Sequence, residues 1–198
     1  MKEKIRALFT DVWTVPNMLT MIRLLLIPVF AALFFSGRKT AALAVFCAAS
    51  LTDMLDGYLA RKLNQITNFG KLFDPLADKL MVLTAMLCQG VAGILPWPEI
   101  IIVACKELLM LLGGAFMLSR NVVVYSNYIG KAAQVFFIAS LILSFFHERF
   151  SAGGVLLWGM TPDLLLLRIT VALALTAMIV YAVEAIRTIR KGSPKEEK

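Results

Sequence analysis

Long apolar stretches separated by short polar breaks run along almost the whole chain. Six of them are long enough for a membrane-crossing helix and too long for a barrel strand, since a helical span needs about 20 apolar residues. Lipid leaves only helices or closed barrels to satisfy the backbone, so the pattern predicts an all-α, polytopic membrane protein with six transmembrane helices. The expected spans are residues 18–36, 41–60, 74–94, 99–118, 128–146 and 164–184.

The two ends of the chain differ from this apolar middle. In residues 2–13, apolar side chains recur at helical spacing among basic ones, which predicts an amphipathic helix lying in the membrane interface. Residues 191–198 are polar and are expected to form a flexible cytoplasmic tail, leaving 1–190 as a single membrane domain. A cleaved signal peptide is the alternative for the first apolar segment, but Arg23 interrupts that segment and five more spans follow.

Composition supports the membrane prediction and narrows the function classes. Hydrophobic residues make up 60% of the chain and charged residues 17%, against about 25% in soluble domains. The net charge is +7, but the basic residues flank apolar segments and form no stripe with aromatics, so no nucleic-acid partner is expected. Most tyrosines and tryptophans fall near span ends, as interfacial anchors do.

The distribution of lysine and arginine predicts the orientation. Six spans put both termini on one side, and only Arg38, Lys39 and Arg149 then lie on the other side. Under the positive-inside rule, both termini and the loop at 61–73 face the cytoplasm, and the protein lies in the plasma membrane. The basic residues on the predicted cytoplasmic side are Lys2, Lys4, Arg6, Arg61, Lys62, Lys71, Arg120, Arg187, Arg190, Lys191, Lys195 and Lys198.

The three cysteines offer no disulfide framework or zinc site. Cys47, Cys88 and Cys105 lie in or beside apolar runs, and none forms a CxxC pair. We expect them to act as small hydrophobic residues in helix packing.

Four aspartates near the second and third spans are the main candidates for chemistry. Asp53 and Asp56 are three residues apart and share a helix face, and Asp74 and Asp78, four apart, share another. The two spans are consecutive and antiparallel, so the pairs are expected to face each other near the cytoplasmic membrane surface. Their mutual repulsion calls for a cationic partner, and carboxylate oxygens suit a hard divalent ion such as Mg²⁺.

A salt-bridge belt is the structural alternative for these acids. Their partners would be Arg61, Lys62, Lys71 and Lys79. Such a belt accounts for one or two acids, but it does not account for two pairs on facing helices.

The full stretch reads D-x2-D-G-x2-A-R-x8-G-x3-D-x3-D. It resembles the signature of the CDP-alcohol phosphotransferase family of membrane enzymes that synthesise phospholipids. The fixed positions are Asp53, Asp56, Gly57, Ala60, Arg61, Gly70, Asp74 and Asp78.

This resemblance implies six transmembrane helices, a cytoplasmic active site and a homodimer. It also implies transfer of a phosphatidyl group from a CDP-linked donor to an alcohol, with release of CMP and no organic cofactor. By position, Asp53, Asp56 and Asp74 are implied ligands of Mg²⁺ or Mn²⁺, with two ions expected. Asp78 is implied as a further ligand and as the general base that activates the acceptor hydroxyl.

The resemblance also implies a nucleotide site and suggests an acceptor. Gly57, Ala60 and Arg61 look like part of the cytidine-diphosphate site, and Gly70 like a close-approach position. The opening VPNMLTMIRLLLIPVF resembles the first helix of bacterial phosphatidylglycerophosphate synthases, which favours CDP-diacylglycerol as donor and glycerol 3-phosphate as acceptor. The acceptor-side candidates are Asn17, Thr20, Arg23, Lys106 and Lys131.

Alternatives stay open for several of these residues. Arg23 could bind phosphate or pair with a motif aspartate, and Lys106 could pair with Glu107 for structure. The chain departs from the subfamily pattern after Gly130, where a single lysine, Lys131, is followed by Gln134 three residues later. A cardiolipin synthase, or an enzyme using inositol phosphate or serine, therefore remains an alternative.

Two other classes compete with this interpretation. A membrane prenyltransferase also uses aspartates to hold Mg²⁺-diphosphate, but it needs more spans. An ion channel or transporter would need polar residues through the membrane, whereas the acids cluster at one surface. His147, the only histidine, is expected on the opposite side, away from the chemistry.

Overall fold

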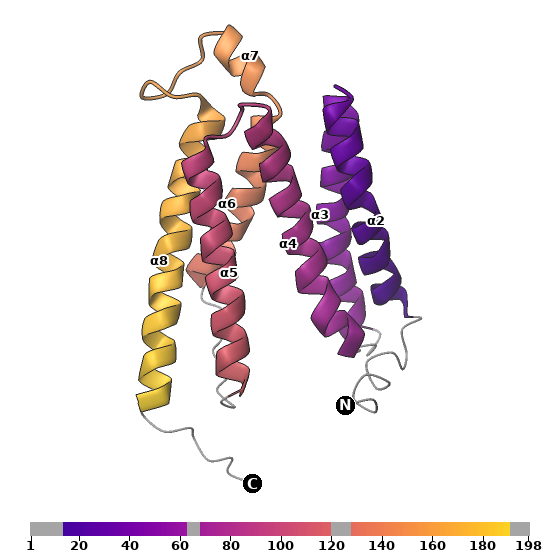
Figure 1. Ribbon diagram of the computed structural model, residues 1–198, viewed down its shortest axis with the longest axis vertical. Coiled ribbons are helices and arrows are strands. Elements are labelled where there is room, and N and C mark those ends of the chain that lie inside the picture. The colour runs from indigo at the N-terminus through magenta and orange to yellow at the C-terminus, as the bar shows by residue number, and fades with distance from the viewer. Residues whose placement is uncertain (1–13, 63–67, 120–127, 191–198) are drawn as a thin grey trace. The chain divides into compact units, whose positions relative to one another are not determined.

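The computed structural model describes residues 14–62, 68–119 and 128–190, and these ranges are almost entirely helical (Figure 1). By contact the chain divides into two units, residues 1–92 and 93–198. Among the described residues, the first unit contains three long helices and the second contains three long helices and one short one. Their bounds are α2 Val15–Phe35, α3 Lys39–Lys62, α4 Asn68–Val91, α5 Trp97–Ser119, α6 Tyr128–Ser144, α7 His147–Ala152 and α8 Pro162–Arg190.

The all-helical prediction is confirmed for the described residues, in which no strand occurs. Each of the six apolar segments falls on one of the six long helices, while the short helix α7 was not expected. Two helical segments, Asn17–Phe35 and Pro162–Arg187, are long and apolar enough to cross a membrane, and Ile129–Ser144 is a shorter apolar helix. The predicted interfacial helix at 2–13 and the tail at 191–198 lie outside the described residues.

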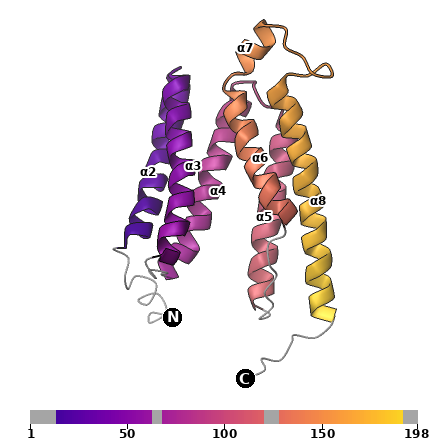
Figure 2. The same cartoon turned by 180° about the vertical axis from the view of Figure 1, so that it is seen from behind.

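In the first unit, α2 packs against both α3 and α4 (Figure 2). The buried face of α2 combines Asn17, Thr20 and Arg23 near its start with Phe30 and Phe34 near its end. These positions are three, four or seven residues apart, as expected for one face of a helix. The face is therefore polar in its first half and aromatic in its second half.

The facing surfaces of α3 and α4 change character in the same way. On α3, Ala42, Phe46 and Ala49 are buried, and the ring of Phe46 lies 6.1 Å from that of Phe30 on α2. One turn further, the same face continues to Asp53. On α4, the buried stripe through Ala77, Met81 and Ala85 begins one turn earlier at Asp74. The polar ends of all three helix faces coincide because α3 ends where α2 and α4 begin.

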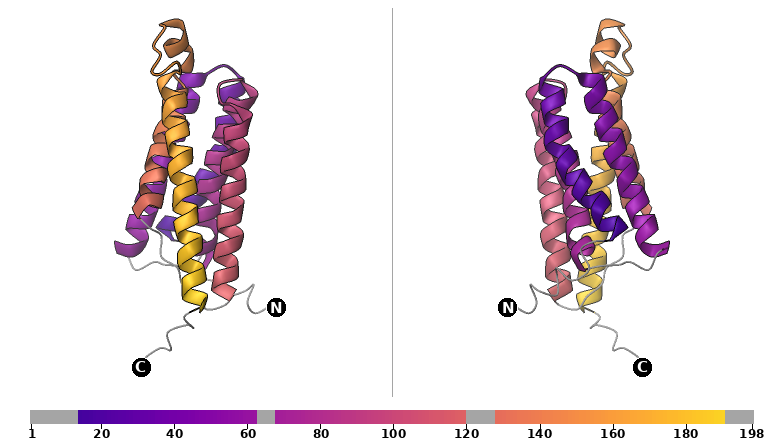
Figure 3. Two further views of the ribbon diagram at one scale, coloured as in Figure 1. Left: turned by 90° about the vertical axis from the view of Figure 1, so that its left-hand side faces the viewer. Right: turned by 90° about the vertical axis from the view of Figure 1, so that its right-hand side faces the viewer.

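In the second unit, α8 packs against α6 and α5, and α6 runs antiparallel to the other two (Figure 3). Buried apolar residues on α6 and α8 include Leu141, Leu167 and Val171. Arg168 Nε on α8 donates to Glu99 Oε1 on α5 at 3.1 Å, so an ion pair joins the first turns of the two parallel helices. Short helix α7 follows α6 at the end where α8 begins.

The loop between α7 and α8 ends in a tight hairpin. Leu157 and Met160 exchange two backbone hydrogen bonds, with N···O distances of 2.8 and 3.1 Å. The two residues between them have positive φ, 53° at Trp158 and 77° at Gly159, which is the pattern of a type I′ turn. Glycine adopts this region freely, but for a bulky residue such as tryptophan it costs about 1–3 kcal/mol.

Candidate functional site

The polar end of the α2–α4 unit contains an ion pair between two helices. Arg23 on α2 donates from a terminal guanidinium nitrogen to Asp53 Oδ1 on α3 at 2.7 Å. The arginine side chain is 1% exposed and that of the aspartate 33% exposed, so the carboxylate lies between the bundle interior and water. Of the two interpretations of Arg23, the structure therefore shows pairing with a motif aspartate.

A second contact lies one helical turn away on α2. The hydroxyl of Thr20, which is fully buried, donates to Asp74 Oδ1 on α4. Helix α2 thus holds one carboxylate on α3 and one on α4 through two residues on its own face. Asp53 of α3 and Asp74 of α4 therefore each bond to the same end of α2, three residues apart on that helix.

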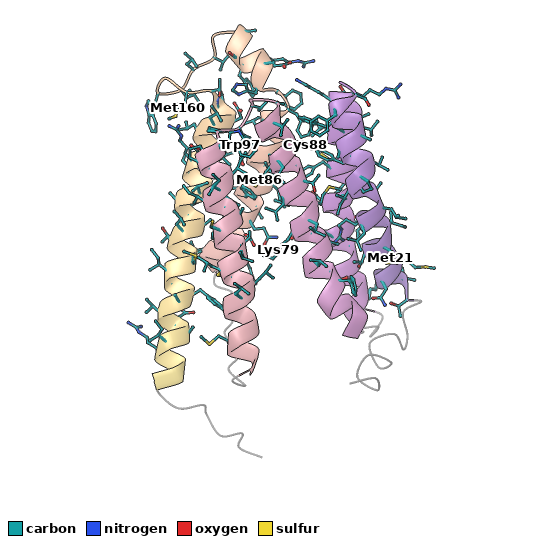
Figure 4. All side chains as sticks on the ribbon, viewed as in Figure 1. Met21, Lys79, Met86, Cys88, Trp97 and Met160 are labelled. Carbon is teal, nitrogen blue, oxygen red and sulfur yellow. The ribbon has the colours of Figure 1, made fainter. Side chains whose placement is uncertain are left out.

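The other predicted residues of this unit are placed less completely. Asp78 lies one turn after Asp74 on α4 and is half-buried, while Gly70 and Asn17 are buried on α4 and α2. Lys79 follows Asp78, near the middle of α4 (Figure 4). The side chains of four further predicted residues lie outside the described part of the structure: Asp56, Gly57, Ala60 and Arg61.

The donor set at this end suits a hard divalent cation. Asp53 and Asp74 each have a second carboxylate oxygen beyond the one bonded to α2, and carboxylate oxygens are the preferred ligands of Mg²⁺ and Mn²⁺. Within the described side chains, no group of three or more His, Cys, Asp or Glu residues converges, and Asp56 is outside that set. A terminal guanidinium nitrogen and a hydroxyl fix one oxygen of each aspartate, which would orient the other oxygen for a ligand.

The predicted acceptor-side lysines belong to the second unit. Lys106 on α5 forms an ion pair with its neighbour Glu107, and both side chains are about one-fifth exposed. The sequence left open whether Lys106 pairs with Glu107, and the structure shows this pair. Lys131 lies exposed near the start of α6.

Sequence reasoning did not foresee the contact made by His147. Its Nδ1 lies 2.8 Å from Asp163 Oδ2, and Thr161 Oγ1 lies 3.4 Å from the same nitrogen. Asp163 is fully buried near the start of α8, and its Oδ1 has no hydrogen-bond partner among the described residues. The pair joins the first residue of α7 to α8. A single histidine and an aspartate 16 residues later carry no local pattern that would indicate their contact.

The cysteines behave as the sequence indicated. Cys47, Cys88 and Cys105 are all free thiols, with Cys88 buried and Cys105 exposed. Cys88 lies on α4 in the half that ends at the loop to α5 (Figure 4). Of the three, only Cys88 is therefore fully buried in helix packing.

Comparison with known proteins adds independent evidence. The model of the CDP-alcohol phosphatidyltransferase family matches residues 13–183. A Mycobacterium tuberculosis protein named "Putative cardiolipin synthase" is 30% identical over 191 residues, covering 91% of this chain and 86% of that protein.

Two further relatives have a different name. The CDP-diacylglycerol--glycerol-3-phosphate 3-phosphatidyltransferase of Bacillus subtilis is 34% identical over 149 residues, covering 66% of this chain and 77% of that protein. The protein of the same name from Pseudomonas fluorescens is 51% identical over 76 residues, covering 37% of this chain and 39% of that protein. The names of these relatives therefore differ, since one names a cardiolipin synthase and two name a glycerol-3-phosphate 3-phosphatidyltransferase.

Proposed function

This chain belongs to the CDP-alcohol phosphatidyltransferase family and is an enzyme of phospholipid biosynthesis. We propose that it is a membrane enzyme that transfers the phosphatidyl group of CDP-diacylglycerol to glycerol 3-phosphate. The products are phosphatidylglycerophosphate and CMP. The observation that carries the proposal is that Asp53 and Asp74, from consecutive helices, each bond to the polar end of α2.

Asp78 is the general base in this proposal. Its carboxylate takes the proton of the acceptor hydroxyl, and the resulting oxygen attacks the phosphatidyl phosphorus. The new P–O bond replaces the bond to the bridging oxygen, which leaves with CMP. Asp78 lies one turn from Asp74 on α4, so the base and a candidate metal ligand share one helix face.

Enzymes of this family generally depend on a divalent metal. Asp53, Asp56 and Asp74, with Asp78 beside them, would hold Mg²⁺ or Mn²⁺, and two ions fit the number of carboxylates. When bound, the metal supplies positive charge against the pyrophosphate of the donor and the phosphate of the leaving CMP. Arg23 and Thr20 are positioning residues, because each fixes one aspartate through a side chain that is itself buried.

The proposed topology follows the apolar segments. All six long helices cross the plasma membrane, both termini and the aspartates face the cytoplasm, and two copies form a homodimer. The charge distribution of the loops and the family membership support this arrangement. The diacylglycerol tails of the donor would stay in the lipid while its head group reaches the aspartates from the membrane surface.

A cardiolipin synthase that uses phosphatidylglycerol is the second candidate. It is favoured by the name of the mycobacterial relative, which aligns with 91% of this chain. The pairing of Lys106 with Glu107 also leaves the phosphate site for a small acceptor without direct support from that lysine.

Acceptor profiling tests the proposal. Purified protein with Mg²⁺ or Mn²⁺ and CDP-diacylglycerol would receive glycerol 3-phosphate, phosphatidylglycerol, inositol phosphate and serine in separate reactions. We expect that glycerol 3-phosphate is the one acceptor of the four that supports CMP release. Release that occurs with phosphatidylglycerol and with no other acceptor would identify the second candidate. Release of diphosphate from a prenyl donor would instead indicate a prenyltransferase.

A further inference from the structure

The loop between α7 and α8 exposes several apolar side chains. The backbone at its tip also has a conformation that a bulky residue does not favour. Val155, Leu156 and Leu157 are exposed, and Trp158 at the hairpin tip is 89% exposed. The tip residue also has a φ of 53°, where asparagine or glycine is the usual occupant. A tryptophan at this position costs conformational energy and gains nothing from packing within the described protein. A contact outside the described protein is therefore needed to offset this conformational cost.

Five of the eight backbone amides in this loop, defined as the Trp158 loop (residues 153–160), donate to carbonyls of α7 or of the loop itself. The amides of Gly153, Gly154 and Val155 donate to carbonyls of α7. Leu157 and Met160 bond to each other. Paired backbone groups are what a segment needs when it enters a medium poor in water. A loop designed for bulk water has no such need, because water satisfies its amides.

The position of the loop in the second unit indicates which water-poor medium the loop would enter. The loop leads directly into α8, whose segment Pro162–Arg187 is apolar enough to cross a membrane. Those 26 residues extend about 39 Å at about 1.5 Å per residue, whereas the hydrocarbon layer is about 30 Å thick. A helix longer than this layer extends beyond it, so the start of α8 and the loop attached to it can reach the interfacial layer while α8 still spans the hydrocarbon.

We propose that the Trp158 loop is a membrane-surface anchor that inserts its indole and aliphatic side chains into the lipid leaflet at which α6 ends and α8 begins. Tryptophan is favoured at this depth because its ring is apolar while its N–H can reach polar head groups. The charged residues of α7, Glu148 and Arg149, are exposed on the neighbouring helix, where they would remain among the head groups. This inference concerns a lipid contact in the second unit and is independent of the acceptor proposed above.

Fluorescence quenching in lipid nanodiscs tests the anchor. The native chain and Trp158→Asn would be compared in nanodiscs of phosphatidylcholine and phosphatidylglycerol, with and without brominated acyl chains. The difference between their emission spectra isolates Trp158 without altering Trp13 or Trp97. Asparagine suits the positive φ of the turn, so the variant is expected to keep the hairpin and fold as well as the native chain.

The expected difference spectrum is shifted to shorter wavelength, loses most of its intensity with brominated lipid and resists aqueous iodide. A matched control carries Ser151→Trp in the Trp158→Asn background, since Ser151 is an exposed polar position on α7. Its emission is expected to respond to iodide and not to brominated lipid. Quenching of Trp158 by iodide alone would overturn the anchor, and protection from both quenchers would overturn it in favour of a protein partner such as a second copy.

Discussion

The two helical units both contain side-chain pairs between helices, but the pairs differ in their surroundings. In the α2–α4 unit, Arg23 is almost fully buried and Asp53 is one-third exposed, at the polar end of the helix faces. In the α5–α8 unit, the Arg168–Glu99 pair leaves the arginine 54% exposed. A buried arginine is costly to desolvate, so its retention beside motif aspartates indicates a functional site. An exposed pair at helix starts needs no such explanation.

The largest effect is expected from Asp78→Asn in the first unit. Without a base to take the acceptor proton, the rate of CMP release should fall by about 10²–10⁴-fold. Membrane insertion should be unchanged, because asparagine has nearly the same shape. Glu184→Gln, at an exposed position of α8, is the matched control and should keep full turnover. Unchanged turnover in Asp78→Asn would contradict the base assignment.

Arg23→Ala should have the next largest effect. Removing one partner of a buried pair costs about 3–5 kcal/mol, and the partial exposure of Asp53 places the loss toward the lower end of that range. Arg23→Lys should recover part of the loss, since it restores the charge without the planar guanidinium. Thermal unfolding in detergent measures both variants. Equal midpoints for Arg23→Ala and the native chain would show that the pair is not structural.

Thr20→Val should weaken the site through Asp74. Loss of a hydrogen bond to a carboxylate costs about 1.5–3 kcal/mol. The expected readout is a higher Mg²⁺ or Mn²⁺ concentration for half-maximal CMP release, because Asp74 loses the contact that orients it. Thr20→Ser keeps the hydroxyl and should keep the native metal dependence. If both variants show that native value, Thr20 does not position the carboxylate.

In the second unit, Asp163→Ala should reduce stability and leave the chemistry intact. The bond between His147 and the buried Asp163 contributes about 1.5–3 kcal/mol if one partner is charged. The unfolding midpoint should therefore fall, while turnover per folded molecule stays at the native value. Asp163→Asn, which retains an acceptor oxygen, should lose less. A fall in turnover per folded molecule would contradict the expectation that this pair affects stability and not the chemistry.

The smallest effect is expected for Arg168→Gln. Arg168 is 54% exposed and Glu99 13% exposed, and because the arginine is open the pair is expected to contribute about 0–1 kcal/mol and to be screened by salt. A double-mutant cycle with Glu99→Gln, followed by unfolding at low and high salt, measures the coupling. Coupling well above this range, or insensitivity to salt, would show that the second unit holds a pair as consequential as Arg23–Asp53.

Local pattern predicted the helices better than it predicted the contacts between them. The six long helices follow from apolar stretches of the right length, and Asp53 and Asp74 follow from antiparallel neighbours that carry acids at adjoining ends. Helix α7 was missed because HERFSA is six residues long and has no apolar period of its own. The hairpin at Trp158 was missed because tryptophan is not a usual residue for a positive φ.

The sequence by itself determined the fold class, the family resemblance and the helix faces that carry the aspartates, because each depends on residues within a few helical turns. Only the tertiary structure decided that Arg23 pairs with Asp53, 30 residues away, and that Thr20 bonds to Asp74, 54 residues away. It likewise decided that Asp163 meets His147. Such choices depend on how helices pack, and a buried polar group takes whichever partner that packing brings within hydrogen-bonding distance.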